Sequence, residues 1–215
     1  MEVIGLLDMS CFVLGSQGQP LHLWRDHIAP RSQNMIEQSS GMPYTLLNML
    51  SNLDQPDSEA QLLLWPGYRA PEYALLHLWE GVRGAGLLHA RMLQEPTNNA
   101  PQSPTPGDDV IVMKVLASIQ ALRDVRKEAC HPNLSDHVVY PLFIASIATG
   151  QGTHERQLAM QSWQVLLQGA ERHKNQTCYD IVLEVWKRRE TLHGTSPWII
   201  ANDFAKELNI EYYLS

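Results

Sequence analysis

The chain has 215 residues, of which 44% are apolar and 18% are charged, so it can bury a substantial core without metal ions or disulfides. Its 23 acidic residues outnumber its 16 basic ones and give a net charge of −7, which argues against a nucleic-acid-binding chain. Three basic residues stand together at one place, Lys187-Arg188-Arg189.

The three cysteines, Cys11, Cys130 and Cys178, are far apart and belong to no Cys-x-x-Cys pair. This usage predicts reduced thiols in a nuclear or cytosolic protein. No basic stretch precedes the first apolar segment, and no apolar run approaches the roughly 18 residues that a membrane-spanning helix needs. We therefore expect neither secretion nor membrane insertion.

Apolar residues recur at helical spacing through most of the chain, which predicts an all-α fold. Residues 3–14 are predicted to form a helix that is buried on most sides. Residues 21–38 are predicted to form a second helix, which Pro30 bends or restarts. A turn over residues 39–43 precedes a short amphipathic helix over residues 44–53.

The longest helix is expected over residues 71–93, with a proline in its first turn. Its glycines Gly84 and Gly86 either weaken it locally or let another backbone approach closely. Residues 95–109 are rich in proline, asparagine and serine, and this composition predicts a mobile loop. The helical period then returns over residues 112–128.

A further apolar segment over residues 137–149 is predicted to be a helix that Pro141 kinks. Thr153 can cap the next helix. Residues 177–180 have the spacing of a capping box, which would start the second helix of a hairpin. Pro197 is expected to open the last helix.

These segments predict an irregular all-α bundle of about eight to ten helices, with helix packing as the source of stability. Residues 1–215 are expected to form a single domain, with residues 95–109 as its mobile part.

Residue types that bind metals do not complete a site in the sequence. Asp108 and Asp109 could begin a carboxylate-rich magnesium site, but the preference of a helix N-terminus for acids is the favoured explanation. Cys130, His131 and His137 supply three candidate zinc ligands, whereas a structural zinc site needs four. The sequence predicts no metal site.

Catalytic motifs are likewise missing. The glycine signatures of nucleotide-binding and hydrolase folds do not occur in the chain. The remaining histidines lack the helical spacing that places two imidazoles on a metal, and we expect them on the surface or satisfied in the interior; they include His22, His27, His77, His89 and His173. The sequence predicts no catalytic residue and no cofactor.

The basic run and the tryptophans have plain structural interpretations. Lys187-Arg188-Arg189 is predicted to form a solvated cap at a helix C-terminus, where cations complement the helix dipole. Trp163, Trp186 and Trp198 stand at helical positions, which indicates core packing rather than cofactor stacking.

The chain from His137 onward resembles the C-terminal regulatory region of fungal-specific transcription factors, the proteins that carry a six-cysteine binuclear zinc cluster. The resemblance rests on residues 140–145 (Tyr-Pro-Leu-Phe-Ile-Ala), residues 154–156 (His-Glu-Arg), residues 184–189 (Glu-Val-Trp-Lys-Arg-Arg) and Trp198. Their order and spacing carry the similarity.

Two upstream segments extend the resemblance over nearly the whole chain. Residues 24–28 (Trp-Arg-Asp-His-Ile) are similar to a Trp and His helix of that family, and residues 40–47 contain its Gly-x-Pro-x-x-Leu turn. The six cysteines, the basic linker and the coiled coil that normally follow one another in the family are missing from the chain. The resemblance therefore implies a regulatory region in the nucleus whose DNA contact comes from elsewhere.

The family's regulatory region usually begins further upstream, so this chain looks like its C-terminal half. We therefore expect the helix over residues 3–14 to have lost packing partners, with an apolar face that is exposed or covered by a second copy.

Two hypotheses for the function follow. The first is a regulatory and interaction module that contacts protein partners, such as a coregulator or a second copy, through apolar helix faces and that could also bind a small effector. The second is a small helical enzyme or ligand-binding protein with an apolar pocket built from Trp79, His77, Tyr140 and His137. An enclosed cavity shared by these four residues, with a strongly shifted histidine, would favour the second.

Overall fold

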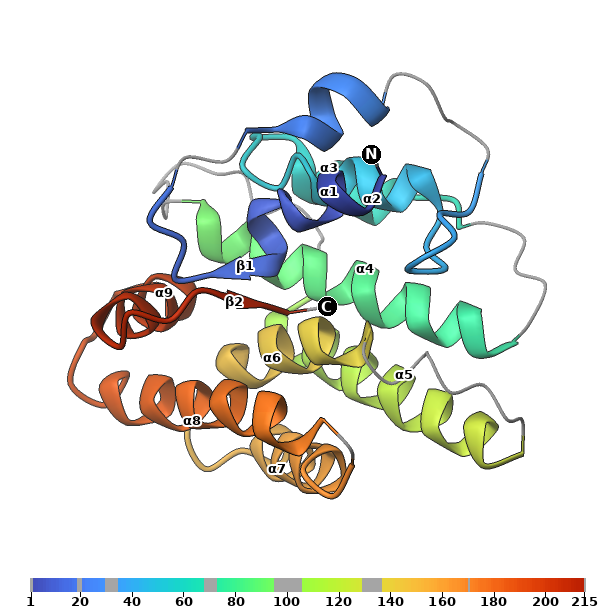
Figure 1. Ribbon diagram of the computed structural model, residues 1–215. Helices are drawn as coiled ribbons and strands as arrows, with labels where there is room; N and C mark the ends of the chain where they lie inside the picture. The colour runs from blue at the N-terminus through green and yellow to red at the C-terminus, as the bar shows by residue number, and fades with distance from the viewer. Residues whose placement is uncertain are drawn as a thin grey trace.

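The computed structural model describes residues 2–18, 21–29, 35–67, 73–94, 106–128, 137–169 and 171–214. These residues are mostly helical, which confirms the all-α bundle (Figure 1). The elements are α1 (Glu2–Leu7), η1 (Ser10–Phe12), β1 (Val13–Leu14), η2 (Trp24–Ile28), α2 (Tyr44–Leu50), α3 (Ser58–Leu64), α4 (Tyr73–Leu93), α5 (Asp108–Glu128), α6 (Val139–Ala148), α7 (His154–Leu166), α8 (Arg172–Arg188), α9 (Pro197–Glu207) and β2 (Tyr212–Tyr213).

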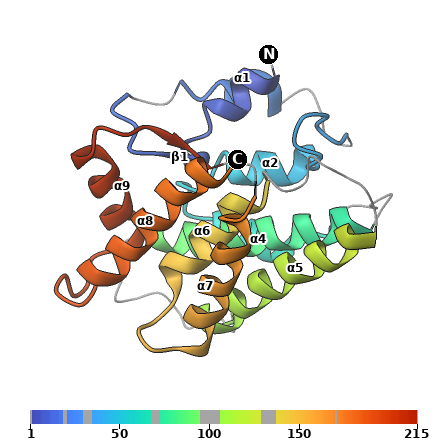
Figure 2. The same cartoon turned by 60° about the horizontal axis from the view of Figure 1, so that its bottom comes forward.

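Helix α6 lies at the centre of the molecule. It packs against α4, α5, α7, α8 and α9 (Figure 2), and every residue from Val139 to Ile147 is buried. A helix that is apolar all round belongs in the interior, which explains why this segment shows no polar face. Pro141 is the third residue of α6, in the first turn, where a backbone N–H has no partner within the helix. The prediction that Pro141 interrupts the middle of this helix is therefore wrong.

Helices α4 and α5 run side by side, and α4 also carries the N-terminal segments on its other face (Figure 1). A Cβ atom at Gly84 would lie 2.6 Å from Cγ2 of Val115 in α5, and one at Gly86 would lie 2.8 Å from Cδ2 of Leu50 in α2. The two glycines thus allow close packing on both sides. The predicted long helix is confirmed as α4, with residues 71 and 72 outside the described part.

The predicted helix over residues 3–14 is wrong in its second half, because α1 ends at Leu7 and is followed by η1 and β1. The Asp8 carboxylate accepts the backbone N–H groups of Leu21 and Leu23 at 2.8 and 2.7 Å. Asp8, the first residue after α1, is thus held against a segment 13 to 15 positions further along the chain.

The expected unpartnered face of this segment is not present among its described side chains. Leu6, Met9, Phe12 and Leu14 are buried by other parts of the same chain, and Leu7 is 49% exposed. The prediction of a largely uncovered apolar face is wrong for these residues.

The second predicted helix, over residues 21–38, is also wrong. Among the described residues of this range, only Trp24–Ile28 forms a helix, of the π type; residues 30–34, which include Pro30, lie outside the described part. Residues 35–43 instead form a hairpin-like loop closed by the bridge between Ile36 and Pro43. The buried Glu37 carboxylate holds this loop by accepting the backbone and hydroxyl hydrogens of Ser39 and Ser40.

Helix α3 and the ribbon formed by strands β1 and β2 were not predicted. Helix α2 confirms the short helix predicted over residues 44–53, although it ends at Leu50. Helix α3, which follows it, had no counterpart in the prediction. Strands β1 and β2 form an antiparallel ribbon in which Val13 pairs with Tyr213, and Leu14 with Tyr212. Two residues a strand are too few to show alternation in the sequence.

The starts of α7, α8 and α9 test the helix starts predicted from Thr153, Thr177 and Pro197. The Thr153 hydroxyl accepts the backbone N–H of Arg156, so the predicted cap is confirmed. Helix α8 begins at Arg172, and Thr177 lies inside it, so the predicted capping box is wrong. Pro197 opens α9 as predicted. Residues 95–105 of the predicted mobile loop lie outside the described part of the chain, and α5 begins at Asp108.

Candidate functional site

The four residues of the hypothetical apolar pocket do not line a common cavity. Trp79 is buried and its Nε1 donates to the Gly41 carbonyl at 2.8 Å. Tyr140 packs edge-on against Phe12, with ring centroids 4.9 Å apart. His137 borders a hollow of about 110 Å³ together with Phe12, and neither Trp79 nor His77 lines that hollow. The geometry therefore does not support the pocket hypothesis.

The histidine with the strongly shifted pKa is His89, which the sequence analysis placed only among the scattered histidines. It is fully buried in α4 with its ring 4.0 Å from that of Trp198, measured between centroids, and its Nδ1 is 3.3 Å from the Tyr140 hydroxyl. Burial lowers the pKa of His89 to about 3. Its Nε2 has no hydrogen-bond partner, so this histidine is neutral and only half satisfied in the interior.

The acidic pair at residues 108 and 109 starts α5, as the helix-dipole interpretation requires. Asp108 forms an ion pair with Arg91, which also pairs with Glu59 of α3 at 2.6 Å. Within the described ranges, no three or more histidine, cysteine, aspartate or glutamate side chains gather where they could hold a metal ion. Cys130 and His131 lie outside those ranges.

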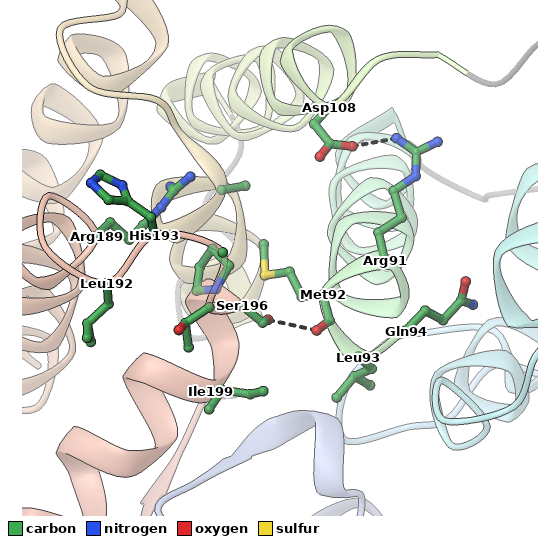
Figure 3. A pocket seen from close by; sticks show the side chains of 14 residues that line it. Arg91, Met92, Leu93, Gln94, Asp108, Arg189, Leu192, His193, Ser196 and Ile199 are labelled. Atoms are coloured by element: carbon green, nitrogen blue, oxygen red, sulfur yellow. Dashed lines mark hydrogen bonds and ion pairs between the residues drawn. The ribbon is translucent and has the colours of Figure 1, made fainter. Parts of the chain in front are cut away.

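A cleft of about 950 Å³ opens in the surface between the C-terminal end of α4, the first turn of α5, the end of α6 and the loop that leads into α9 (Figure 3). Its apolar lining includes Leu93, Leu192 and Ile199, which are 40–50% exposed. The Ser196 hydroxyl donates to the Met92 carbonyl at 2.7 Å and so fixes the loop against α4 (Figure 3).

Next to this cleft, the C-terminal end of α6 gathers polar groups from three helices. Ser146 accepts from two indoles, since its hydroxyl binds Nε1 of Trp163 at 2.9 Å and its carbonyl binds Nε1 of Trp186 at 2.8 Å. Nη1 of Arg189 donates to the carbonyls of Ile147 and Thr149 at 2.9 and 2.7 Å. The last carbonyls of a buried helix, which have no partner within it, are thus satisfied by side chains.

A second hollow of about 330 Å³ opens over this end of α6; it is lined by Thr149, Gln151, Arg156, Trp186, Arg189, Glu190 and His193. Arg156 lies in the first turn of α7, and its guanidinium stacks on the Trp186 ring at 4.2 Å from the centroid. Arg189 and His193 also line the larger cleft, so the two openings adjoin.

The charges around this hollow are unbalanced. Burial lowers the pKa of Arg189, and the nearby positive charge of Arg156 lowers it further. Among the described residues no ion pair joins either guanidinium to a carboxylate. The Glu190 carboxylate, which borders the hollow, accepts from Gln151 Nε2 at 3.1 Å.

The two arginines of the basic run make ion pairs and hydrogen bonds that the sequence does not indicate. Lys187 and Arg188 are in the last turn of α8, as predicted, and Arg188 forms ion pairs with Glu184 at 2.9 Å and Glu207 at 2.6 Å. These hydrogen bonds raise the pKa of Arg188. Lys187 is mostly exposed, but Arg188 and Arg189 are not, so the prediction of a solvated cap is wrong for the two arginines.

The predicted core tryptophans are confirmed, because Trp163, Trp186 and Trp198 are all buried. Of the grouping around α6, the sequence analysis quoted Arg156 and Arg189 in separate motifs. It did not connect them, because 33 positions separate the two residues and only the packing of α7 on α8 places them together.

Comparison with known proteins gives one family. The family model described as fungal-specific transcription factor domain matches residues 26–214. No curated protein and no solved structure matches the chain. In the described part of the chain, no helix has both the length and the apolar character required to cross a bilayer.

Proposed function

Because the chain belongs to the fungal-specific transcription factor domain family, we propose that it is a regulatory and interaction module of a fungal transcription factor, working in the nucleus. The observation that carries this proposal is the family match itself, which includes every helix from α2 to α9 and both openings described above. Family membership supports a role in the regulation of transcription.

We propose that the module works by contact and not by catalysis. His89, whose pKa is lowered strongly by burial, lies in the core and lines neither the cleft nor the hollow over α6. A substrate in either opening could not reach it. The net charge of −7 opposes binding to DNA phosphates, so we assign sequence-specific DNA contact to another part of the transcription factor or to a partner.

The cleft is the best candidate for the contact with a coregulator protein. Three exposed apolar side chains, Leu93, Leu192 and Ile199, gather along it, and burial of such side chains is the main source of affinity at protein interfaces. We further propose that residues 1–215 form one domain, a proposal supported by the single core cluster that runs from Leu6 to Leu214.

A reporter assay tests the proposal directly. The chain is fused to an unrelated DNA-binding domain in a fungal host, and transcription from a promoter with the matching operator is measured. We expect a change in reporter output that Ile199→Glu abolishes, because a carboxylate in the cleft opposes apolar contact. Leu64→Glu is the matched control, since Leu64 is exposed and does not line the cleft.

An unchanged reporter with a folded, nuclear fusion protein would contradict the proposal. A mobility-shift assay on the chain alone supplies the second arm, because sequence-specific binding that depends on zinc would show direct DNA recognition instead.

A further inference from the structure

Two arginines face the hollow over the C-terminal end of α6 without a carboxylate between them. Each is held in place by the protein, Arg189 by the carbonyls of Ile147 and Thr149 and Arg156 by the Trp186 ring. Elsewhere, Arg25, Arg83, Arg91 and Arg188 each contact a carboxylate within 3 Å, whereas Arg123 donates to the Ser162 carbonyl at 2.7 Å.

Capping of α6 explains only part of this arrangement. The carbonyls of Ile147 and Thr149 account for Nη1 of Arg189, but no hydrogen bond or ion pair to a described residue engages the Arg156 guanidinium. Arg156 is also the third residue of α7, and a cation in the first turn of a helix is opposed by the helix dipole. The Glu190 carboxylate borders the hollow but binds Gln151, so two like charges lie there without an ion pair to either guanidinium.

The other groups around the hollow suit an anion. Gln151 Nε2 and the His193 imidazole can donate hydrogen bonds, and the Glu190 carboxylate is turned to Gln151 rather than to either arginine. Guanidinium groups bind carboxylate and phosphate oxygens through paired hydrogen bonds, and both groups here are fixed before a ligand arrives. A volume of about 330 Å³ admits a small molecule.

We propose that the hollow between Arg156 and Arg189 is a binding site for a small oxyanion, the carboxylate or phosphate group of a metabolite. The bound anion would bridge α7 to the loop that leads into α9. Because Arg189 and His193 also line the cleft, occupancy of the hollow would alter the surface offered to a protein partner. The site itself stands independently of the function proposed above.

Thermal unfolding and calorimetry of the purified chain test this site. Inorganic phosphate and citrate are added separately at 0.1–10 mM, a range about the affinity expected for a single anion site, against sodium chloride at equal ionic strength. At about ten times the dissociation constant we expect a saturable rise in Tm of roughly 3 to 6 °C. A response to phosphate alone would indicate a phosphate site, and a response to citrate alone would indicate a carboxylate site.

The variant Arg156→Gln should weaken binding at least about tenfold, the loss of one charge-assisted contact. Lys187→Gln removes the same charge from the neighbouring helix and should bind as the wild type does. If Arg156→Gln is poorly folded, Arg156→Lys keeps the charge without the planar fork and should still weaken binding. The proposal fails if neither anion gives a saturable shift beyond that of chloride, or if the Arg156 variants respond as the wild type does.

Discussion

The N-terminal layer, residues 2–67, and the bundle from α4 to α9 are stabilised in different ways. Helices of the N-terminal layer have at most seven residues, whereas those of the bundle have 10–21. A helix of seven residues consists almost entirely of ends, whose backbone groups need partners outside the helix.

Side chains supply those partners in the N-terminal layer. Asp8 accepts the backbone N–H groups of Leu21 and Leu23, and Arg25 donates to the Ser51 carbonyl at 2.7 Å. In the bundle, apolar contact dominates and polar groups concentrate at the end of α6. Loss of a side chain should therefore act locally in the N-terminal layer and on the whole fold in the bundle.

The largest effect is expected for Trp186→Ala. This change removes a buried indole, its hydrogen bond to the Ser146 carbonyl and the surface on which Arg156 stacks. The free energy of unfolding should fall by about 3–5 kcal/mol, as measured by urea denaturation. Leu64→Ala, at a position that is 81% exposed, should change it by less than about 0.5 kcal/mol. Equal losses in the free energy of unfolding for Trp186→Ala and Leu64→Ala would contradict the claim that apolar packing in the bundle stabilises the whole fold.

The same contrast explains what the sequence predicts well. Long helices repeat their apolar period over several turns, so α4 is found close to its predicted bounds, and α9 begins at the predicted Pro197. After α1 the sequence continues the helical pattern, but Asp8 accepts the backbone N–H groups of Leu21 and Leu23 where the helix has ended. A hydrogen bond between segments so far apart in the chain has no local signal in the sequence.

The candidate sites lie at the limit of what sequence can show. Each motif that carries the family resemblance is visible along the chain, yet the hollow exists only because α7 and α8 both pack on α6. The predicted pocket was wrong for the same reason. Trp79 and Tyr140 combine ring and polar group as binding residues do, but their polar atoms are turned to other buried groups, the Gly41 carbonyl and His89.

The second-largest effect on stability is expected at acid pH and comes from His89, the buried residue whose Nε2 has no hydrogen-bond partner. The pKa of His89 is about 3 in the folded chain, against about 6.5 when unfolded, so protons bind the unfolded state preferentially as the pH falls below 6.5. The stability that this difference contributes is complete above pH 6.5 and is lost as the pH falls toward 3. Between pH 6.5 and 5 the loss should be about 2 kcal/mol.

His89→Leu tests this linkage, because it removes the titrating group from the same buried position. Denaturation at several pH values should show a shallower decline for the variant than for the wild type between pH 6.5 and 5. His173→Leu changes an exposed histidine and should leave the decline as it is. Identical pH profiles for the wild type and His89→Leu would show that the bundle interior tolerates the imidazolium.

The smallest effect is expected in the N-terminal layer, for Glu37→Gln. Burial opposes ionisation of Glu37, but hydrogen bonds from Ser39 and Ser40 outweigh it and lower the pKa, so the carboxylate is charged at neutral pH. Both of its oxygens accept backbone N–H groups, at 2.9 Å from Ser39 and 2.6 Å from Ser40. An amide can serve only one of them, which should cost about 1–2 kcal/mol.

The location of that loss distinguishes the two regions. The Glu37 loop, residues 35–43, carries the Gly41 carbonyl that accepts a hydrogen bond from the Trp79 indole. Hydrogen exchange should therefore accelerate at this indole and at the N–H groups of residues 39–42. Exchange in α6 should remain unchanged, because no side chain of the Glu37 loop supplies its hydrogen bonds. Faster exchange throughout α6 would instead mean that the N-terminal layer and the bundle unfold as one unit.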